Sequence, residues 1–288
     1  MARAAQGGWP GRKRLALSVV VNVEEGAEYS VLDGDKAPEV VDEMGVALRK
    51  PVRNLSNESN YRYGIAAGAP RVLEVLRKNA VRATFTSAAL ALERAPALAK
   101  AIVQAGHEVC AHGHRWIQQH GFTPEEEREF IRAAAASIEK TTGRRPQGWL
   151  SRYLVTENTR RLLAEEGFRY HMDDYSGDRP FWDQADGRPI VILPYAIDTN
   201  DMKMWANAAF TPDDWLAYVT DTFDVLYREA TRDLRMMSVG LHLRIIGRPG
   251  RIGKLERFLQ YAGRKPGVWF ATRAEIAEAW ATMHPFGR

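Results

Sequence analysis

Short apolar runs and amphipathic segments alternate along most of this chain. The apolar runs, several of them rich in β-branched residues, predict buried strands at residues 15–23, 83–87, 108–111, 147–150, 168–172, 190–194, 236–242 and 268–271. The segments with helical spacing predict helices at residues 69–78, 96–105, 123–142, 157–166, 211–231, 252–262 and 273–282. This alternation favours a parallel barrel of the (β/α) type, and a doubly wound sheet is the competing layout.

Two longer stretches, 24–68 and 173–188, show no clear periodicity. Long loops inside a compact domain are often functional, so these stretches are candidates for substrate contact. The sequence has no internal repeat and no linker rich in glycine, proline or serine. We therefore expect the 288 residues to form a single domain, with residues 1–14 as an N-terminal extension.

Composition narrows the class of protein. Hydrophobic residues make up 45% and charged residues 26% of the chain, which is typical of a globular protein. No apolar stretch approaches the roughly 20 residues that cross a bilayer, and the apolar run from Ala16 is interpreted as a strand rather than a signal peptide. The single cysteine, Cys110, cannot form an internal disulfide, so we expect a reducing, cytoplasmic location and no membrane partner.

The charge distribution argues against a nucleic-acid partner. The 40 lysines and arginines are nearly balanced by 36 acidic residues, and the net charge of +4 is spread rather than clustered. Glycine-rich phosphate loops and the GxSxG nucleophile elbow are absent from the sequence. A small-molecule substrate remains the expected partner.

Polar residues follow the predicted strands one after another. In a parallel barrel the carboxyl ends of the strands meet at the active site, so these residues are expected to converge there. They are Asn22, Glu24, Glu25, His112, His114, Arg152, Asp173, Asp174, Asp198, Asn200, Asp201, His242 and Arg244. Such convergence favours an enzyme over a scaffold.

Each group has a chemical and a structural interpretation. One carboxylate of the Glu24–Glu25 pair could serve as a general base or metal ligand, since adjacent residues of an extended chain face opposite ways; a solvated loop start is the alternative. His112 and His114 could bind a metal or be structural. His242 could be a general acid or a core histidine.

Several blocks, in order over nearly the whole chain, resemble the polysaccharide deacetylase (NodB-homology) superfamily, and within it the metal-independent allantoinase-like cyclic amide hydrolases. The blocks include VNVEEGAE at 21–28, SNESNYRYG at 56–64, GHEVCAHGHRW at 106–116, PYAIDTNDM at 194–202 and GLHLRIIGRP at 240–249. The resemblance implies a distorted (β/α)7 TIM-like barrel and hydrolysis of a non-peptide C–N amide bond. It also implies a homo-oligomer, a dimer or a tetramer.

The resemblance also implies which residues act, and the sequence departs from the metal-dependent pattern. Asn22 stands where the family's catalytic base is aspartate, Glu24 where a metal aspartate is, and Trp116 where the second metal histidine is. His112 and the late His242 are retained. The expected cofactor is therefore none or one divalent metal, with zinc favoured; Glu24, His112 and His114 are its candidate ligands, with Glu58 as a further replacement.

The function predicted on this basis is ring opening of a small cyclic amide, ureide or imide. The predicted catalytic residues are Glu24, which activates water, His242, which protonates the leaving nitrogen, and Asp198. The predicted substrate-binding residues are Glu25, Glu58, Trp116, Arg152, Asn200, Asp201 and Arg244. N-deacetylation of an N-acetylated sugar or small amide is the alternative reaction, and an inactive small-molecule-binding protein is the alternative of another class.

Overall fold

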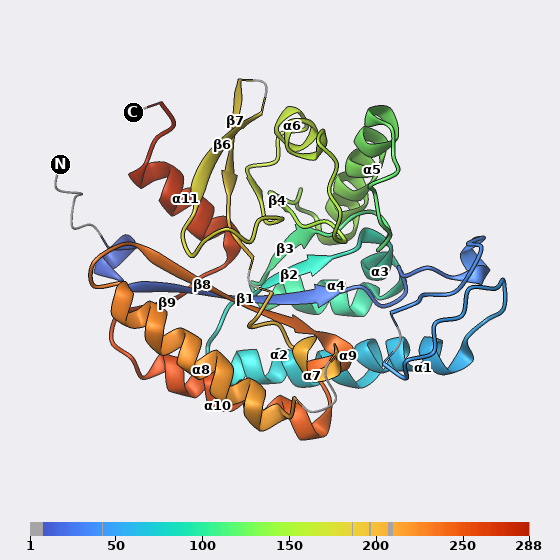
Figure 1. Ribbon diagram of the computed structural model, residues 1–288, viewed down its shortest axis with the longest axis horizontal. Helices are drawn as coiled ribbons and strands as arrows, with labels where there is room; N and C mark the ends of the chain where they lie inside the picture. The colour runs from blue at the N-terminus through green and yellow to red at the C-terminus, as the bar shows by residue number, and fades with distance from the viewer. Residues whose placement is uncertain (1–7, 42, 186, 196, 207–209, 288) are drawn as a thin grey trace.

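A single curled sheet organises the protein (Figure 1). The computed structural model describes residues 8–287 except 42, 186, 196 and 207–209. Within them the sheet has nine strands, in the order β6-β7-β5-β4-β3-β2-β1-β8, with β9 paired to β1. The strands are β1 (Leu15–Val23), β2 (Thr84–Ser87), β3 (Glu108–Ala111), β4 (Gly148–Trp149), β5 (Tyr170–His171), β6 (Phe181–Ala185), β7 (Arg188–Ile192), β8 (Arg235–His242) and β9 (Val268–Phe270).

Helices cover the outside of this sheet. Figure 1 shows α2, α8 and α10 along one side, beneath β1 and β8, and α5 and α6 outside β3 and β4. The helices are η1 (Pro10–Arg12), η2 (Val31–Asp33), α1 (Leu55–Tyr63), η3 (Gly64–Gly68), α2 (Ala69–Lys78), α3 (Ala89–Arg94), α4 (Pro96–Gln104), α5 (Pro124–Thr142), α6 (Thr159–Glu165), α7 (Lys203–Ala206), α8 (Pro212–Glu229), α9 (Leu243–Ile246), α10 (Pro249–Gly263) and α11 (Arg273–Met283). Among the residues described, no helix is both long and apolar enough to cross a membrane.

The strand β1 pairs with three other strands of the sheet. All nine of its residues are buried, and it pairs in parallel with β8 along one edge and with β9 and then β2 along the other. Such an apolar, β-branched run is what a strand covered on both faces requires. In the described part of the chain no ladder joins β6 or β7 to β8, so the sheet stays open and forms a half-barrel. The expected distorted TIM-like barrel is confirmed in this form.

The two stretches without clear periodicity contain regular structure that the sequence analysis did not predict. Residues 173–188 include β6, which pairs antiparallel with β7. Residues 24–68 include α1 and the π-helical η3. The polar helix α1 buries only Asn57 and Tyr61, so it has no apolar stripe that a periodicity search could detect.

The chain before β1 is partly built into the core. Trp9 is buried, its indole N–H donates to the carbonyl of Arg235 at 2.7 Å, and its ring lies 5.8 Å from that of Trp269. Trp9 of the predicted extension therefore packs on the barrel, while residues 1–7 lie outside the described residues. The expectation of a single domain stays a prediction.

Candidate active site

A small cavity lies where the carboxyl ends of the central strands meet. Its volume is about 50 Å³. It is lined by residues at or after the carboxyl ends of β1, β3, β4, β5, β7 and β8, as strand-end placement predicts. The lining consists of Asn22, Glu24, His112, Trp116, Leu150, Ser151, Arg152, Tyr153, Tyr175, Tyr195, Asn200, Met202 and His242.

Glu24 is the carboxylate of this cavity. Its Oε2 accepts a hydrogen bond from Arg244 Nη1 at 2.7 Å, and its Oε1 lies 3.3 Å from His242 Nε2 and 3.7 Å from His112 Nε2. Burial alone would raise the pKa of Glu24, but the charges of His242 and Arg244 outweigh it and hold that pKa well below its usual range. Glu24 is therefore an ionised carboxylate with one oxygen anchored and the other directed to the histidines.

Glu25 faces away from the cavity. Its carboxylate accepts the backbone N–H groups of Glu24 at 3.1 Å and of Arg244 at 3.2 Å. It packs against Gly64, where any Cβ atom would collide with the carboxylate, so only glycine fits there. Burial raises the pKa of Glu25 to about 7, against the lowering effect of Arg244. The backbone alternation thus leaves Glu24 as the only member of the pair that lines the cavity.

His242 is held by Asp201. The Nδ1 atom of His242 lies 2.7 Å from Asp201 Oδ1, and Asp201 Oδ2 also accepts the backbone N–H groups of His242 and Ile246 at 2.8 and 3.1 Å. Burial would lower the pKa of His242, but Glu24 and Asp201 outweigh it and raise that pKa to about 10. The imidazole is therefore protonated at neutral pH, with its ring orientation fixed and Nε2 directed at Glu24.

His112 has other partners than His242. Its Nδ1–H donates to the carbonyl of Leu150 at 2.7 Å, because a carbonyl can only accept. The lone pair on Nε2 then accepts the indole N–H of Trp116 at 3.1 Å. Both ring nitrogens of His112 are thus satisfied within the protein.

This arrangement bears on the metal site considered from the sequence. A zinc ligand needs the lone pair that the Trp116 indole occupies on His112. His114 is partly exposed and lies 3.9 Å from Glu93, outside the cavity lining. In the described residues no cluster of three or more histidine, cysteine or acidic side chains could hold a metal ion. The donor set of Glu24, His112 and His114 does not fit a divalent metal.

The sequence predicts that Arg152 donates hydrogen bonds to the substrate, but most of its donors bind other protein groups. Its two terminal nitrogens donate to the carboxylate of Glu39 at 2.6 and 2.7 Å, and Nη1 also donates to the carbonyl of Trp116 at 2.7 Å. Its guanidinium lies 3.7 Å from the centre of the Trp116 ring. Arg152 therefore ties the loop around Glu39 to the wall of the cavity.

Replacing Glu39 by glutamine is expected to destabilise the protein by about 3–5 kcal/mol, because it leaves the buried guanidinium of Arg152 without its counter-charge. Urea unfolding followed by circular dichroism measures the change. Glu74→Gln, which breaks only exposed ion pairs on α2, is the matched control and should leave the unfolding midpoint close to that of wild type. Equal losses in the two variants would show that the Arg152 pair is not structural.

Four further residues predicted for the site do not line the cavity. They are Asp198, Glu58, Asp201 and Arg244, and the last two contact residues that do line it. Asp198 accepts a hydrogen bond from Tyr218 at 3.1 Å, and Glu58 on α1 forms an ion pair with Arg53 at 2.6 Å. Neither lines the cavity, and on the loop after β7 it is Asp201, not Asp198, that contacts His242. Arg244 lies fully buried beneath Glu24, where it contacts protein groups.

Among the residues in or beside the cavity that the sequence analysis did not predict, Tyr195 and Glu39 matter most for its chemistry and shape. Tyr195 lines the cavity, and its position directly after the strand at 190–194 satisfies the same strand-end rule that selected the others. Glu39 lies in the stretch without periodicity, where nothing in the sequence distinguishes it from other carboxylates.

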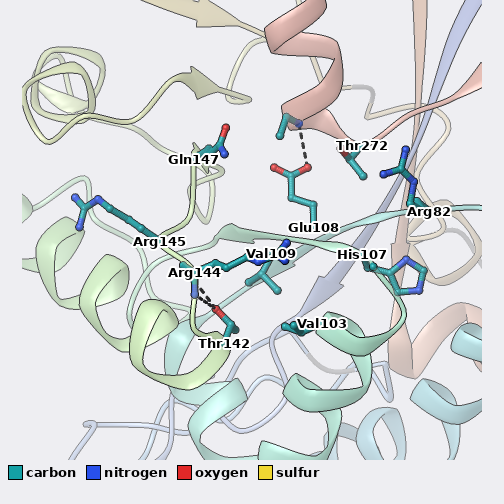
Figure 2. Close-up of a pocket in the computed structure, with 12 residues that line it drawn as sticks. Arg82, Val103, His107, Glu108, Val109, Thr142, Arg144, Arg145, Gln147 and Thr272 are labelled. Atoms are coloured by element: carbon teal, nitrogen blue, oxygen red, sulfur yellow. Dashed lines mark hydrogen bonds between the residues drawn. The ribbon is translucent and has the colours of Figure 1, made fainter.

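A second cavity, of about 220 Å³, lies at the opposite, amino end of the strands (Figure 2). Figure 2 shows Arg82, His107, Arg144 and Arg145 around it, together with Glu108 at the start of β3. The Glu108 carboxylate is already used, since it accepts from the hydroxyls of Thr84 and Tyr170 and from a backbone N–H of α11. This cavity has no paired acid and base comparable to Glu24 and His242.

Comparisons with known proteins agree with this fold. Residues 59–171 match the family model described as polysaccharide deacetylase. The solved structure of PuuE allantoinase is 42% identical with a TM-score of 0.92, covering 96% of this chain and 94% of that one. A probable polysaccharide deacetylase from Pseudomonas aeruginosa PAO1 is 43% identical with the same TM-score of 0.92 and the same coverage of 96% and 94%. A Schizosaccharomyces pombe protein named "Putative polysaccharide deacetylase" is 36% identical, covering 96% of this chain and 93% of its own.

Proposed function

Because the chain belongs to the polysaccharide deacetylase family and is a hydrolase of carbon–nitrogen bonds, we propose that it opens the ring of a small cyclic amide, ureide or imide. The observation that carries the proposal is the direct pairing of Glu24 with His242, 3.3 Å apart, in a small cavity. The likeness to a structure named as an allantoinase supports a cyclic substrate. The aromatic walls and the small volume favour a compact ring over a glycan strand.

Glu24 and His242 are the base and the acid of the proposed reaction. At neutral pH Glu24 is ionised and His242 is protonated, so each holds the proton state that its task needs. A water molecule gives a proton to Glu24 Oε1 as its oxygen bonds to the amide carbonyl carbon. His242 then gives its Nε2 proton to the ring nitrogen as the C–N bond breaks.

The two proton transfers assist each other. Ionised Glu24 is one of the charges that raise the pKa of His242. When Glu24 takes the proton of water, that charge is neutralised, so His242 becomes a stronger acid at the step in which it must donate. Arg244 keeps Oε2 of Glu24 anchored during the transfer, and Asp201 keeps the histidine ring in place.

The proposal includes catalysis by side chains without a resident metal, since the lone pair of His112 is committed to Trp116. Purified protein is expected to open at least one ring among allantoin, hydantoin, succinimide and dihydrouracil. Incubation with EDTA should change that rate by less than about twofold, since no step depends on a Lewis acid. Elemental analysis of the same sample should find metal well below one equivalent.

The same assay separates the alternatives. N-acetylglucosamine oligomers in the panel test the deacetylase reading: hydrolysis of these alone would replace ring opening by N-deacetylation. Loss of activity with EDTA and its return with zinc would overturn the metal-free mechanism while leaving the substrate class intact.

A further inference from the structure

Tyr195 brings a hydroxyl into the same cavity as Glu24 and His242. The residue is buried, and its hydroxyl lies over Gly240 of β8, where a Cβ atom would collide with it and with the Asn200 amide. Residues 240 and 242 are two apart on one strand, so they share a face of the sheet. The glycine therefore makes room for the phenol beside His242.

Two asparagine amides donate to the Tyr195 hydroxyl. The Nδ2 atoms of Asn22 and Asn200 each lie 3.2 Å from Oη. Neither amide can be reversed, because Asn22 Nδ2 also donates to the carbonyl of Leu241 at 3.0 Å and Asn200 Oδ1 accepts the backbone N–H of Met202 at 2.9 Å. Tyr195 is thus an acceptor in both of these contacts.

The hydroxyl proton of Tyr195 is left free by this arrangement. A phenol has one proton to donate and two lone pairs, and both lone pairs are occupied by the asparagines. No hydrogen bond among the described residues uses the proton, and the residue lines the cavity. Burial raises the pKa of Tyr195 well above its usual value, so the group stays a neutral donor at working pH.

We propose that Tyr195 is a catalytic residue that donates its hydroxyl hydrogen bond to the oxyanion formed during amide hydrolysis. The inference rests on the proposed function and deepens it. As the oxygen of water bonds to the carbonyl carbon, the C=O π electrons move onto the carbonyl oxygen, which becomes the oxyanion. Tyr195 stabilises that charge without losing its proton; the electrons return to re-form C=O as the C–N bond breaks and His242 protonates the nitrogen.

The first test is Tyr195→Phe, which removes only the hydroxyl. We expect kcat on the ring that wild type opens fastest to fall by roughly a hundred- to a thousandfold, with KM changed by less than about threefold. On the analogue with sulfur in place of the attacked carbonyl oxygen, the loss should be less than about tenfold, because sulfur accepts hydrogen bonds weakly. Tyr218→Phe, which removes a partly exposed hydroxyl bonded to Asp198, is the control and should stay within about twofold of wild type.

The second test, Asn22→Asp, reverses one hydrogen bond while keeping the size of the side chain. A carboxylate at position 22 can only accept, so the Tyr195 hydroxyl would donate its hydrogen bond to that carboxylate and no longer to the substrate. We expect a loss of kcat similar to that of Tyr195→Phe, with thermal melting confirming that both variants fold.

The outcomes separate this inference from the proposed function. If wild type opens a ring but Tyr195→Phe retains its kcat, or loses the oxygen and sulfur substrates equally, the oxyanion role is overturned and ring opening stands. If Asn22→Asp is as fast as wild type, the assignment of the free proton is wrong. If wild type opens no ring but hydrolyses an N-acetyl amide, ring opening fails, and the same pair of variants tests the oxyanion role on that amide.

Discussion

Glu24→Gln is expected to lower kcat by at least about a hundredfold, with a smaller change in KM. Glutamine keeps the shape of the side chain but cannot accept the proton of the attacking water. It also removes the negative charge that Arg244 and His242 share, since Glu24 Oε2 bonds to Arg244 at 2.7 Å and Oε1 lies 3.3 Å from His242. The variant therefore loses both the general base and the negative charge that raises the pKa of His242.

Steady-state kinetics on the ring opened by wild type measure this effect. Glu108→Gln is a matched control, because Glu108 is a largely buried glutamate of the same barrel at the opposite end of the strands. Its kcat should stay within about threefold of wild type even if the free energy of unfolding falls. Equal kcat values for Glu24→Gln and wild type would remove Glu24 from the mechanism.

The fold was predictable from sequence wherever a segment buries an apolar face. The helix α2 and the strands β1 and β3 begin and end where the pattern of apolar residues predicts. The helix α5 begins within one residue of its predicted start, where Thr123 and Glu126 form a capping box. Prediction failed for α1 and β6, which gain their stability from tertiary contacts rather than from a local apolar period.

The candidate site was predictable only as a set of strand ends. Glu24 and His242 follow or close strands that the sequence defines well, so their convergence follows from parallel topology. The loop after β7 leaves the choice between Asp198 and Asp201 open, because a loop has no fixed side-chain period. Only the folded chain shows that Asp201 contacts His242 at 2.7 Å while Asp198 turns to a helix.

The pairing of His112 with Trp116 shows the same limit in another form. The sequence shows a tryptophan, which cannot bind a metal, in place of the family's second metal histidine. This removes one ligand but leaves His112 available as another. The hydrogen bond from the indole N–H to His112 Nε2, 3.1 Å long, adds that the neighbouring ligand is also occupied. That contact depends on the turn after β3, which spacing alone does not define.

His242→Ala is expected to lower kcat by at least about a hundredfold, because the departing nitrogen then leaves without a proton. Rings whose departing nitrogen is a weaker base, such as imides, should lose less than rings that release an amine. This difference between substrates is the signature of a lost general acid. His120→Ala, at an exposed position, is the control and should match wild type within about twofold.

The pH profile tests how His242 is held. Because Glu24 and Asp201 raise its pKa to about 10 against the effect of burial, the protonated acid should support kcat at neutral pH and be lost as pH rises through about 10. The stability contributed by its charge is complete below the unfolded pKa, about 6.5, and is lost over the same rise. In Asp201→Asn the histidine loses one of its two negative neighbours, so the alkaline limb of kcat should move to lower pH. If the alkaline limb of kcat stays at the same pH in Asp201→Asn, Asp201 does not set the proton affinity of His242. If the limb stays at the same pH in His242→Ala, another group titrates there.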